Sequence, residues 1–316
     1  MSMKNKLLTT LILSSSALTI TGVINHCIKT SATSKNLLKE SKYQYYCWRF
    51  GDIYYKKCGT GKPLLLIHDL HSSSGSHQWD SIISTLSKSY TVYAIDLLGC
   101  GCSEKPSFTY TNYLFVQLIS DFIKSEIGHR TDVISLGNSS NFVIMACSNS
   151  PELFDRILLV NPESIPSCSH IPGKLSKIYK SFLDFPIVGT LLYHIASSKK
   201  SLEKSLSEDG FYNPHNLKKR YINICHETAH LGFSPKSIYT SVRCNYTNCN
   251  IVNALKKINN SIYLVGSEHI ENEEELLKEY LDYNCAIEYT LISGCKHLPQ
   301  IEKSEKFLSI VQTFLS

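Results

Sequence analysis

The sequence lacks most features that mark a nucleic-acid-binding, zinc-binding or disulfide-linked protein. Only 19% of its 316 residues are charged, and the net charge of +5 comes from scattered lysines rather than from a basic stripe interleaved with aromatic residues. The 12 cysteines form no framework, and close pairs such as Cys100 and Cys102 do not have the usual spacing of zinc ligands. We therefore expect no nucleic-acid partner, and we expect unpaired thiols, as in a reducing compartment.

Charge is also absent from residues 7–24, LLTTLILSSSALTITGVI. This length is at the lower limit for a helix that spans a bilayer. We predict an N-terminal membrane anchor, and hence a membrane-associated protein, followed by a polar linker over residues 25–41. Lysines lie on both sides of the segment, so the positive-inside rule does not give its orientation. The alternative is a signal peptide cleaved at the small residues 15–17, which would make the protein secreted.

From residue 42 onward, short apolar runs alternate with helical patterns. KPLLLIHDL, residues 62–70, is apolar until a sharp polar end, which is typical of a central strand buried on both faces. Such alternation predicts a mostly parallel sheet flanked by helices. It stops over residues 165–250, which contain helical patterns and no convincing strand. We predict an α/β core over residues 42–164 and 251–316, with a helical cap inserted over residues 165–250.

The residues capable of chemistry follow the predicted strands, at the edge where open parallel sheets collect their functional groups. The strand ends are, in chain order, His68-Asp69-Leu70, Asp96, Gly137-Asn138-Ser139, Asn161-Pro162-Glu163, Gly266-Ser267-Glu268-His269 and Gly294-Cys295-Lys296-His297. A serine, several carboxylates and a histidine therefore share one edge, in the order serine, acid, histidine.

This order resembles that of the α/β-hydrolase fold family, and the resemblance covers residues 42–316. IHDL is similar to the family's His-Gly oxyanion segment, and DLLGCGCSEKP to its D-x-x-G-x-G-x-S turn. LGNSSNF is similar to the nucleophile elbow G-x-S-x-G, and GCKHLPQIEKSEKF to the loop and helix that deliver the histidine. The resemblance implies an α/β-hydrolase fold with a helical cap and a hydrolase that needs no metal or organic cofactor.

The resemblance further implies that Ser139 is the nucleophile and that His297 is its general base. The nucleophile of an elbow has a strained backbone that lifts its side chain clear of the sheet. Gly137 supplies the first elbow glycine, whereas Asn141 stands where the family has the second. We expect a slightly splayed elbow that is not destroyed.

The oxyanion hole is implied to consist of the backbone N–H groups of Leu70 and Ser140. Asp69 replaces the glycine that the family has beside this hole. A carboxylate at that position would oppose a developing oxyanion unless it turned away. This departure counts against a highly efficient serine hydrolase.

The sequence has no acidic residue at the position where the family usually places the acid of the triad. The usual position, three residues after the glycine that ends the fifth strand, is His269. Glu268 is the first substitute, because its long side chain could swing to the histidine. Glu163, which follows the fourth strand, is the second, and Glu271 is the third.

The apolar stretch PIVGTLLYHI in the cap and the predicted anchor together indicate a hydrophobic substrate. We expect the protein to cleave a carboxylic ester or a related acyl bond of a hydrophobic small molecule or lipid. The first alternative is a degenerate hydrolase fold that binds a ligand without turnover.

The second alternative is a zinc hydrolase. His226, Glu227 and His230 form the motif H-E-x-x-H, in which two histidines on one helix face bind zinc and the glutamate activates water. A third protein ligand is also required, but no Asp, Glu or His occurs between His230 and Glu268. We therefore rank this reading last.

Overall fold

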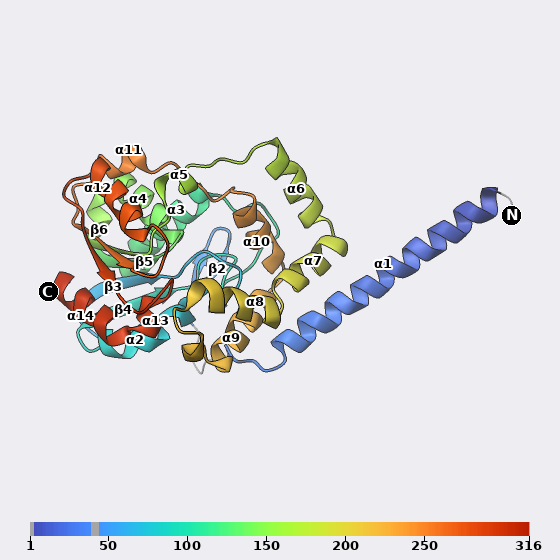
Figure 1. Cartoon of the computed structure of the whole chain (residues 1–316), viewed down its shortest axis with the longest axis horizontal. Helices are drawn as coiled ribbons and strands as arrows, with labels where there is room; N and C mark the ends of the chain where they lie inside the picture. Colours follow the sequence, from blue (N-terminus) through green and yellow to red (C-terminus); the bar gives the residue numbers. More distant parts are fainter. Residues whose placement is uncertain (1–2, 39–43, 316) are drawn as a thin grey trace.

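The computed structural model of this chain describes residues 3–38 and 44–315, with side chains from residue 16 onward. An eight-stranded sheet lies at its centre, in the order β1-β2-β4-β3-β5-β6-β7-β8 (Figure 1). The strands are β1 Gln44–Trp48, β2 Gly51–Cys58, β3 Lys62–Ile67, β4 Tyr90–Ile95, β5 Thr131–Leu136, β6 Phe154–Val160, β7 Ile262–Ser267 and β8 Glu288–Ile292. β3 to β8 pair in parallel, whereas β1 and β2 form an antiparallel edge. The predicted, mostly parallel α/β sheet is confirmed.

Helices cover both faces of the sheet, which is why its central strands are apolar without interruption. Successive side chains of β3 point to opposite faces: Leu65 and Ile67 pack into one hydrophobic cluster, and Leu64 and Leu66 into the other. The first cluster is covered by α3 Asn112–Phe122, α4 Ser139–Asn149, α11 Val252–Leu255 and α12 Glu273–Tyr283. The second is covered by α2 Asp80–Leu86 and α14 Ser304–Phe314, and α13 Pro299–Glu302 lies just before α14.

Residues 165–250 contain helices and no strand. The α-helices of this cap are α5 Ile165–Cys168, α6 Lys174–Asp184, α7 Val188–Ala196, α8 Lys199–Ser205, α9 Lys219–His230 and α10 Pro235–Arg243. α6 to α10 lie together beside the sheet, whereas the short α5 packs against α12 of the core (Figure 1). The chain enters this block after β6 and returns from it to β7, so the cap is carried by the core without interrupting the sheet.

The N-terminal helix α1 runs from Met3 to Thr33 and projects from the cap side of the molecule (Figure 1). Its last turns contact α7 and α9: the Asn25 side chain donates to the Ile187 carbonyl at 2.8 Å, and Lys29 donates to the Gly232 carbonyl at 2.7 Å. The predicted linker over residues 25–41 is therefore wrong for residues 25–33, which are helical, while residues 39–41 lie outside the described part of the chain. The predicted anchor, residues 7–24, lies within α1. In the ranges that the structure describes, no helix has both the length and the apolar composition needed to cross a bilayer.

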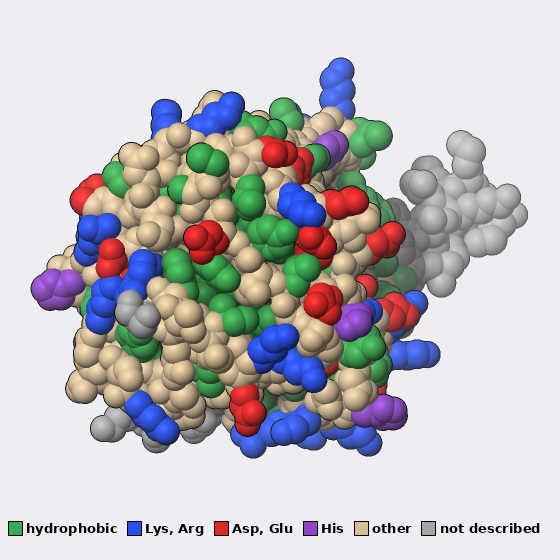
Figure 2. All heavy atoms as spheres, turned by 60° about the vertical axis from the view of Figure 1, so that its left-hand side comes forward, with side chains coloured by type: hydrophobic (Ala, Val, Ile, Leu, Met, Phe, Trp, Pro, Cys, Tyr) green, Lys and Arg blue, Asp and Glu red, His purple; other side chains and the backbone are tan. Residues whose placement is uncertain are grey.

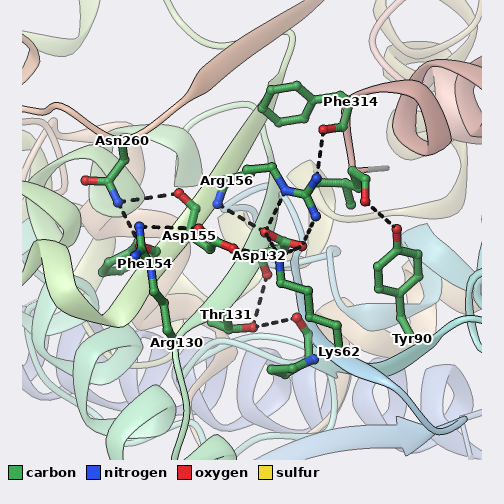
Figure 3. A network of polar contacts seen from close by, with 12 residues as sticks. Lys62, Tyr90, Arg130, Thr131, Asp132, Phe154, Asp155, Arg156, Asn260 and Phe314 are labelled. Atoms are coloured by element: carbon green, nitrogen blue, oxygen red, sulfur yellow. Dashed lines mark hydrogen bonds and ion pairs between the residues drawn. The ribbon is translucent and has the colours of Figure 1, made fainter.

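Charged side chains tie the amino ends of the central strands together (Figure 3). Asp132 on β5 is fully buried and binds Lys62 of β3 at 2.9 Å and Arg156 of β6 at 3.0 Å. Lys62 also binds Asp155 at 2.6 Å. This network closes the edge of the sheet opposite to the one where function was predicted.

Candidate active site

The strand-to-helix corner after β5 consists of Gly137 and Asn138, because β5 ends at Leu136 and α4 begins at Ser139. Gly137 has a φ of 57°, in the left-handed region, whereas Asn138 has helical angles. In a nucleophile elbow this strained conformation belongs to the nucleophile itself. The expectation that Ser139 would adopt it is wrong. The strained position lies two residues earlier, on a residue without a side chain.

Ser139 is instead the first residue of α4, and its side chain is fully buried. Its hydroxyl donates a hydrogen bond to the backbone carbonyl of His68 at 2.6 Å. The N–H groups of Ser140 and Asn141 donate to the carbonyls of Gly137 and Asn138, so they close the first turn of the helix. The Ser140 N–H is therefore not free to serve an oxyanion hole, and Asn141 lies in the helix rather than at a glycine-like corner.

His297 lies at the predicted edge, on the loop between β8 and α13. The side-chain amide of Asn161 donates to the carbonyls of Lys296 and His297 at 3.2 and 3.1 Å, and Ser267 donates to the Lys296 carbonyl at 2.7 Å. These bonds hold the loop in place. The imidazole Nε2 lies 3.0 Å from Oδ2 of Asp69. Within the described chain it makes no hydrogen bond to Ser139, so the structure does not bring the predicted pair together.

Asp69 is the centre of the site. Its Oδ1 accepts hydrogen bonds from the backbone N–H of Leu70 at 2.8 Å and of Asn138 at 3.0 Å, while Oδ2 faces His297. A Cβ added to Gly137 would lie only 2.4 Å from Oδ1. The carboxylate thus fills the space that an elbow side chain would occupy.

The two donors to Asp69 have the positions of an oxyanion hole when Gly137 is counted as the elbow residue. One is the residue after the elbow, and the other belongs to the loop after β3. Leu70 was predicted as such a donor, and its N–H group is engaged by the adjacent carboxylate. The expectation that Asp69 merely disturbs the hole is wrong, because its own carboxylate occupies it.

Asp69 and His297 each shift the pKa of the other in the direction that favours the ionised form. Burial opposes charge on His297, but the hydrogen bond and the charge of Asp69 outweigh it and raise the pKa of the imidazole. Burial likewise acts to raise the pKa of Asp69, but the hydrogen bond and charge of His297 lower it overall. The side chains are 17% and 33% exposed, respectively, so solvent screens the pair only partly.

The carboxylates predicted to complete a triad do not bind the histidine. Glu268 is exposed, and its backbone N–H donates to the Ile292 carbonyl. Glu271 is also exposed, although it lines a shallow depression shared with His297. Glu163 lies closer: burial, followed by the charge of Asp69, raises its pKa to about 7. No hydrogen bond joins any of the three to His297 in the described residues, so the predicted acid contact is not formed.

Glu273 is a further acid that the sequence analysis missed. It begins α12, is 3% exposed, and has an Oε1 atom without a hydrogen-bond partner in the described structure. Burial raises its pKa to about 7, although the charge of His297 opposes this shift. The available signal was the run of glutamates in the first turn of α12, but a run of identical residues does not indicate which glutamate turns inward.

A cavity of about 200 Å³ opens onto Asp69 and His297. The cap supplies part of its wall through Leu202, Tyr221 and Cys225. Burial is the main cause that raises the pKa of the Tyr221 phenol, so this hydroxyl stays protonated. A cavity of this size accepts a small molecule or the reacting end of a larger one.

The H-E-x-x-H motif lies on α9 in the cap, away from this cavity's acids. The rings of His226 and His230 are 4.4 Å apart, and one nitrogen of His230 bonds the His226 carbonyl at 2.7 Å. Glu227 is buried against the N-terminal segment, where it accepts from the N–H of Leu38 at 3.4 Å. Within the described residues, no group of three or more His, Cys, Asp or Glu side chains is placed to hold a metal ion. The motif therefore lacks the third ligand that a zinc site requires.

Comparison with known proteins agrees with this architecture. Residues 62–186 match the family described as alpha/beta hydrolase fold. The chain is 26% identical over 145 residues to a soluble epoxide hydrolase from Corynebacterium sp. strain C12, which covers 45% of this chain and 46% of that protein. The match to uncharacterized mycobacterial proteins spans 36% of their length, so the chain covers only a third to a half of these curated relatives.

Two solved structures are similar over most of the chain. The carboxylesterase CesB from Bacillus subtilis has a TM-score of 0.69 at 16% identity, covering 93% of this chain and 98% of its own. The epoxide hydrolase CorEH has a TM-score of 0.69 at 19% identity, covering 86% of this chain and 98% of its own. At these identities the likeness concerns architecture rather than reaction. The strand order, the flanking helices and these comparisons together show that the chain has the α/β-hydrolase fold.

Proposed function

We propose that this protein is a hydrolase that cleaves a carbon–oxygen bond of a small molecule, such as a carboxylic ester or a related bond, with Asp69 and His297 as the reacting pair. One observation carries the proposal. The Asp69 carboxylate is held by two backbone N–H groups at Oδ1 and by the His297 imidazole at Oδ2. A partly buried carboxylate in such a position, opening onto a cavity, has the placement of an active nucleophile.

The sequence analysis predicted Ser139 as the nucleophile, but the position of Ser139 favours this role less than the position of Asp69 does. Its hydroxyl is buried and donates to a backbone carbonyl, so no base lies within reach of its proton. Asp69 needs no activation, since the charge of His297 keeps it ionised. The carboxylate comes from the loop after β3 and reaches the place that a β5 elbow residue normally fills.

The reaction then runs in two steps. Oδ2 of Asp69 attacks the electrophilic carbon and forms an ester bond to it, while the bond from that carbon to the leaving oxygen breaks. The leaving oxygen takes the proton of the His297 imidazolium. Neutral His297 next removes a proton from water, which attacks Cγ of the aspartyl ester. The negative charge that develops on Oδ1 is stabilised by the N–H groups of Leu70 and Asn138.

In the last part of that step the bond from Cγ to Oδ2 breaks, so Oδ2 leaves with the product and the oxygen of water takes its place in Asp69. The departing alkoxide takes the proton of the new carboxyl group, which leaves Asp69 ionised and His297 protonated as at the start. The chemistry favours attack at a saturated carbon, because the intermediate is then an ordinary ester. Attack at an acyl carbon would give the more reactive anhydride. The similarity to epoxide hydrolases makes an epoxide a second substrate class to test besides an ester.

A second candidate function is ligand binding without turnover. It is favoured by the absence of a side chain at Gly137 and by the filled oxyanion hole, which leaves no place for a substrate carbonyl oxygen. In this case Asp69 and His297 are a fixed ion pair on the floor of a binding cavity.

The decisive experiment compares Asp69→Asn with Ser139→Ala, using p-nitrophenyl butyrate and styrene oxide as probes. We expect Asp69→Asn to abolish turnover and Ser139→Ala to retain most of it. His297→Gln removes the proton donor of the first step and the base of the second. Prolonged incubation with styrene oxide, which offers a saturated carbon, should therefore form the ester on the peptide that contains Asp69 slowly and leave it unhydrolysed, and mass spectrometry detects that adduct.

Single turnover of the wild type in ¹⁸O water should place the label in Asp69. Fluorophosphonate labelling that disappears in Ser139→Ala would return the role of nucleophile to Ser139. A folded wild type that turns over neither probe and is not labelled supports the binding function instead.

A further inference from the structure

The cap presents an apolar face to the outside of the molecule. On α6, Leu175, Ile178, Tyr179 and Phe182 follow the spacing of one helix face and are all exposed, Leu175 by 82% and Ile178 by 68%. The opposite face buries Leu183 and Lys180, and Lys180 pairs with Asp184. Most large apolar side chains of α6 therefore face outward, whereas a helix that only packs on its own core would turn them inward.

The neighbouring segments continue this apolar face. Phe185 is exposed in the connection to α7, and Val188, Leu192 and Ile195 are exposed along α7. α7 contacts both α6 and α1. On α1 the exposed apolar residues are Leu18, Ile20, Val23 and Ile24. Figure 1 shows α6, α7 and α1 along the same side of the molecule. Isolated exposed apolar side chains are ordinary, but a run across three adjoining helices marks an interaction surface.

The charge of these segments indicates what that surface meets. Residues 174–196, which include α6 and α7, contain three lysines and one aspartate, and residues 3–38 contain four lysines and no acid. Lys180 is buried and pairs with Asp184, so Lys174 and Lys177 are the exposed charges of the α6–α7 stretch. The face shown in Figure 2, which brings the left-hand side of Figure 1 forward, carries basic and acidic side chains intermixed. An apolar helix face bordered by lysines matches the interface of a bilayer that contains anionic lipids.

We propose that α6, α7 and the exposed part of α1 form a docking face for an anionic lipid surface. The apolar side chains enter the boundary between headgroups and acyl chains, and lysines such as Lys174 and Lys177 lie at the headgroups. This inference is independent of the proposed reaction, since none of these residues contacts Asp69 or His297.

The test is co-sedimentation of the full chain with phosphatidylcholine vesicles, with and without phosphatidylglycerol. We expect binding to the anionic vesicles that weakens with salt. The double variant Leu175→Asp/Ile178→Asp should lose at least about tenfold in partitioning, because two large side chains leave the lipid boundary and two negative charges are added. Lys174→Glu/Lys177→Glu should lose about tenfold or more.

The matched control is Lys88→Glu/Lys306→Glu, which makes the same change of charge on exposed lysines near the end of α2 and on α14, on the other side of the molecule. It should bind anionic vesicles nearly as the wild type does. Equal losses in both lysine variants would mean that only net charge matters, and would overturn the proposed face. Absence of vesicle binding would also overturn it. So would a dimer that Leu175→Asp/Ile178→Asp dissociates in the absence of vesicle binding, because the occupant would then be a second copy of this chain.

Discussion

Both edges of the sheet contain acidic and basic side chains, but the balance between acids and cations differs at the two edges. At the amino edge, Asp132 is matched by two fixed cations, Lys62 and Arg156, and it also accepts from the Arg156 backbone N–H at 3.1 Å (Figure 3). At the carboxyl edge, one imidazole, His297, faces several acids. It binds Asp69 and lies in the field of Glu163 and Glu273, whose pKa values are raised to about 7.

The difference in charge balance between the two edges indicates which cluster of charged residues takes part in catalysis. The Asp132 carboxylate is bound by cations from the strands on either side of it, so it serves to hold those strands together. Acids that are buried without enough cations have pKa values near the working pH, as catalytic sites require. The carboxyl edge, where cations do not match the acids, is also the edge that opens onto a cavity.

Asp69→Asn at the carboxyl edge should lower kcat/KM by at least about 10³-fold, because it removes the attacking carboxylate. The fold should persist, since an amide oxygen can still accept from Leu70 and Asn138. Turnover of p-nitrophenyl butyrate and styrene oxide, together with circular dichroism, measures both points. Activity near that of the wild type would show that Asp69 is not the nucleophile.

Asp132→Ala at the amino edge should lower the stability of the fold and leave catalysis unchanged. It leaves two cations without their shared buried partner and should lower the free energy of unfolding by about 3 kcal/mol. The folded fraction should keep its kcat, because the network lies at the far edge of the sheet. Urea denaturation with parallel kinetics tests this, and a specific loss of kcat would contradict the separation of the two edges.

Gly137→Ala probes the space that Asp69 fills. The new Cβ would lie 2.4 Å from Oδ1 at a φ of 57°, so we expect about 2 kcal/mol of destabilisation and a loss of activity as the carboxylate moves away from the Asn138 N–H. The matched control is Gly128→Ala. Gly128 has a φ of 71° and nothing within 4 Å of the added atom, so only backbone strain should appear, with activity retained. Equal effects in the two variants would show that the Asp69 contact is unimportant.

Glu273→Gln should change how stability depends on pH. The folded protein keeps a proton on Glu273 up to about pH 7, whereas the unfolded chain releases it near the ordinary glutamate pKa of 4.5. The wild type therefore loses stability from this group as pH rises between these values. The variant removes that loss and should be more stable than the wild type by about 1–2 kcal/mol at pH 8, with little difference at pH 4. Glu275→Gln, exposed on the same helix, is the control. A difference that is constant with pH would contradict the raised pKa of Glu273.

Prediction from the sequence succeeded where the signal is local and repeated. The run Lys62–Ile67 and the helical patterns between the strands predicted the parallel sheet, because a strand buried on both faces must be apolar throughout. His297 was placed at the correct edge by its position after β8. Prediction failed at the elbow, where the spacing of Gly137 and Ser139 permits two registers. The choice between them depends on where the strand ends, which one motif does not specify.

The roles of the acids also depended on burial. Asp69 looked like an obstacle in the sequence, since the motif gives no distance between its carboxylate and the Asn138 N–H. Glu273 was missed because several glutamates open α12, and only packing decides which one turns inward. Glu268 was chosen for its reach, but it faces solvent.

The alternation of strands and helices, the helical block after β6 and the edge at which polar groups gather can all be inferred from the sequence. These features follow from periodic burial and from the rule that parallel strands end on the same side. The strained conformation of Gly137, and the carboxylate from the loop after β3 that fills the space above it, depend on tertiary packing. The reason is steric, because a side chain on residue 137 and the Asp69 carboxylate would occupy the same volume at that corner.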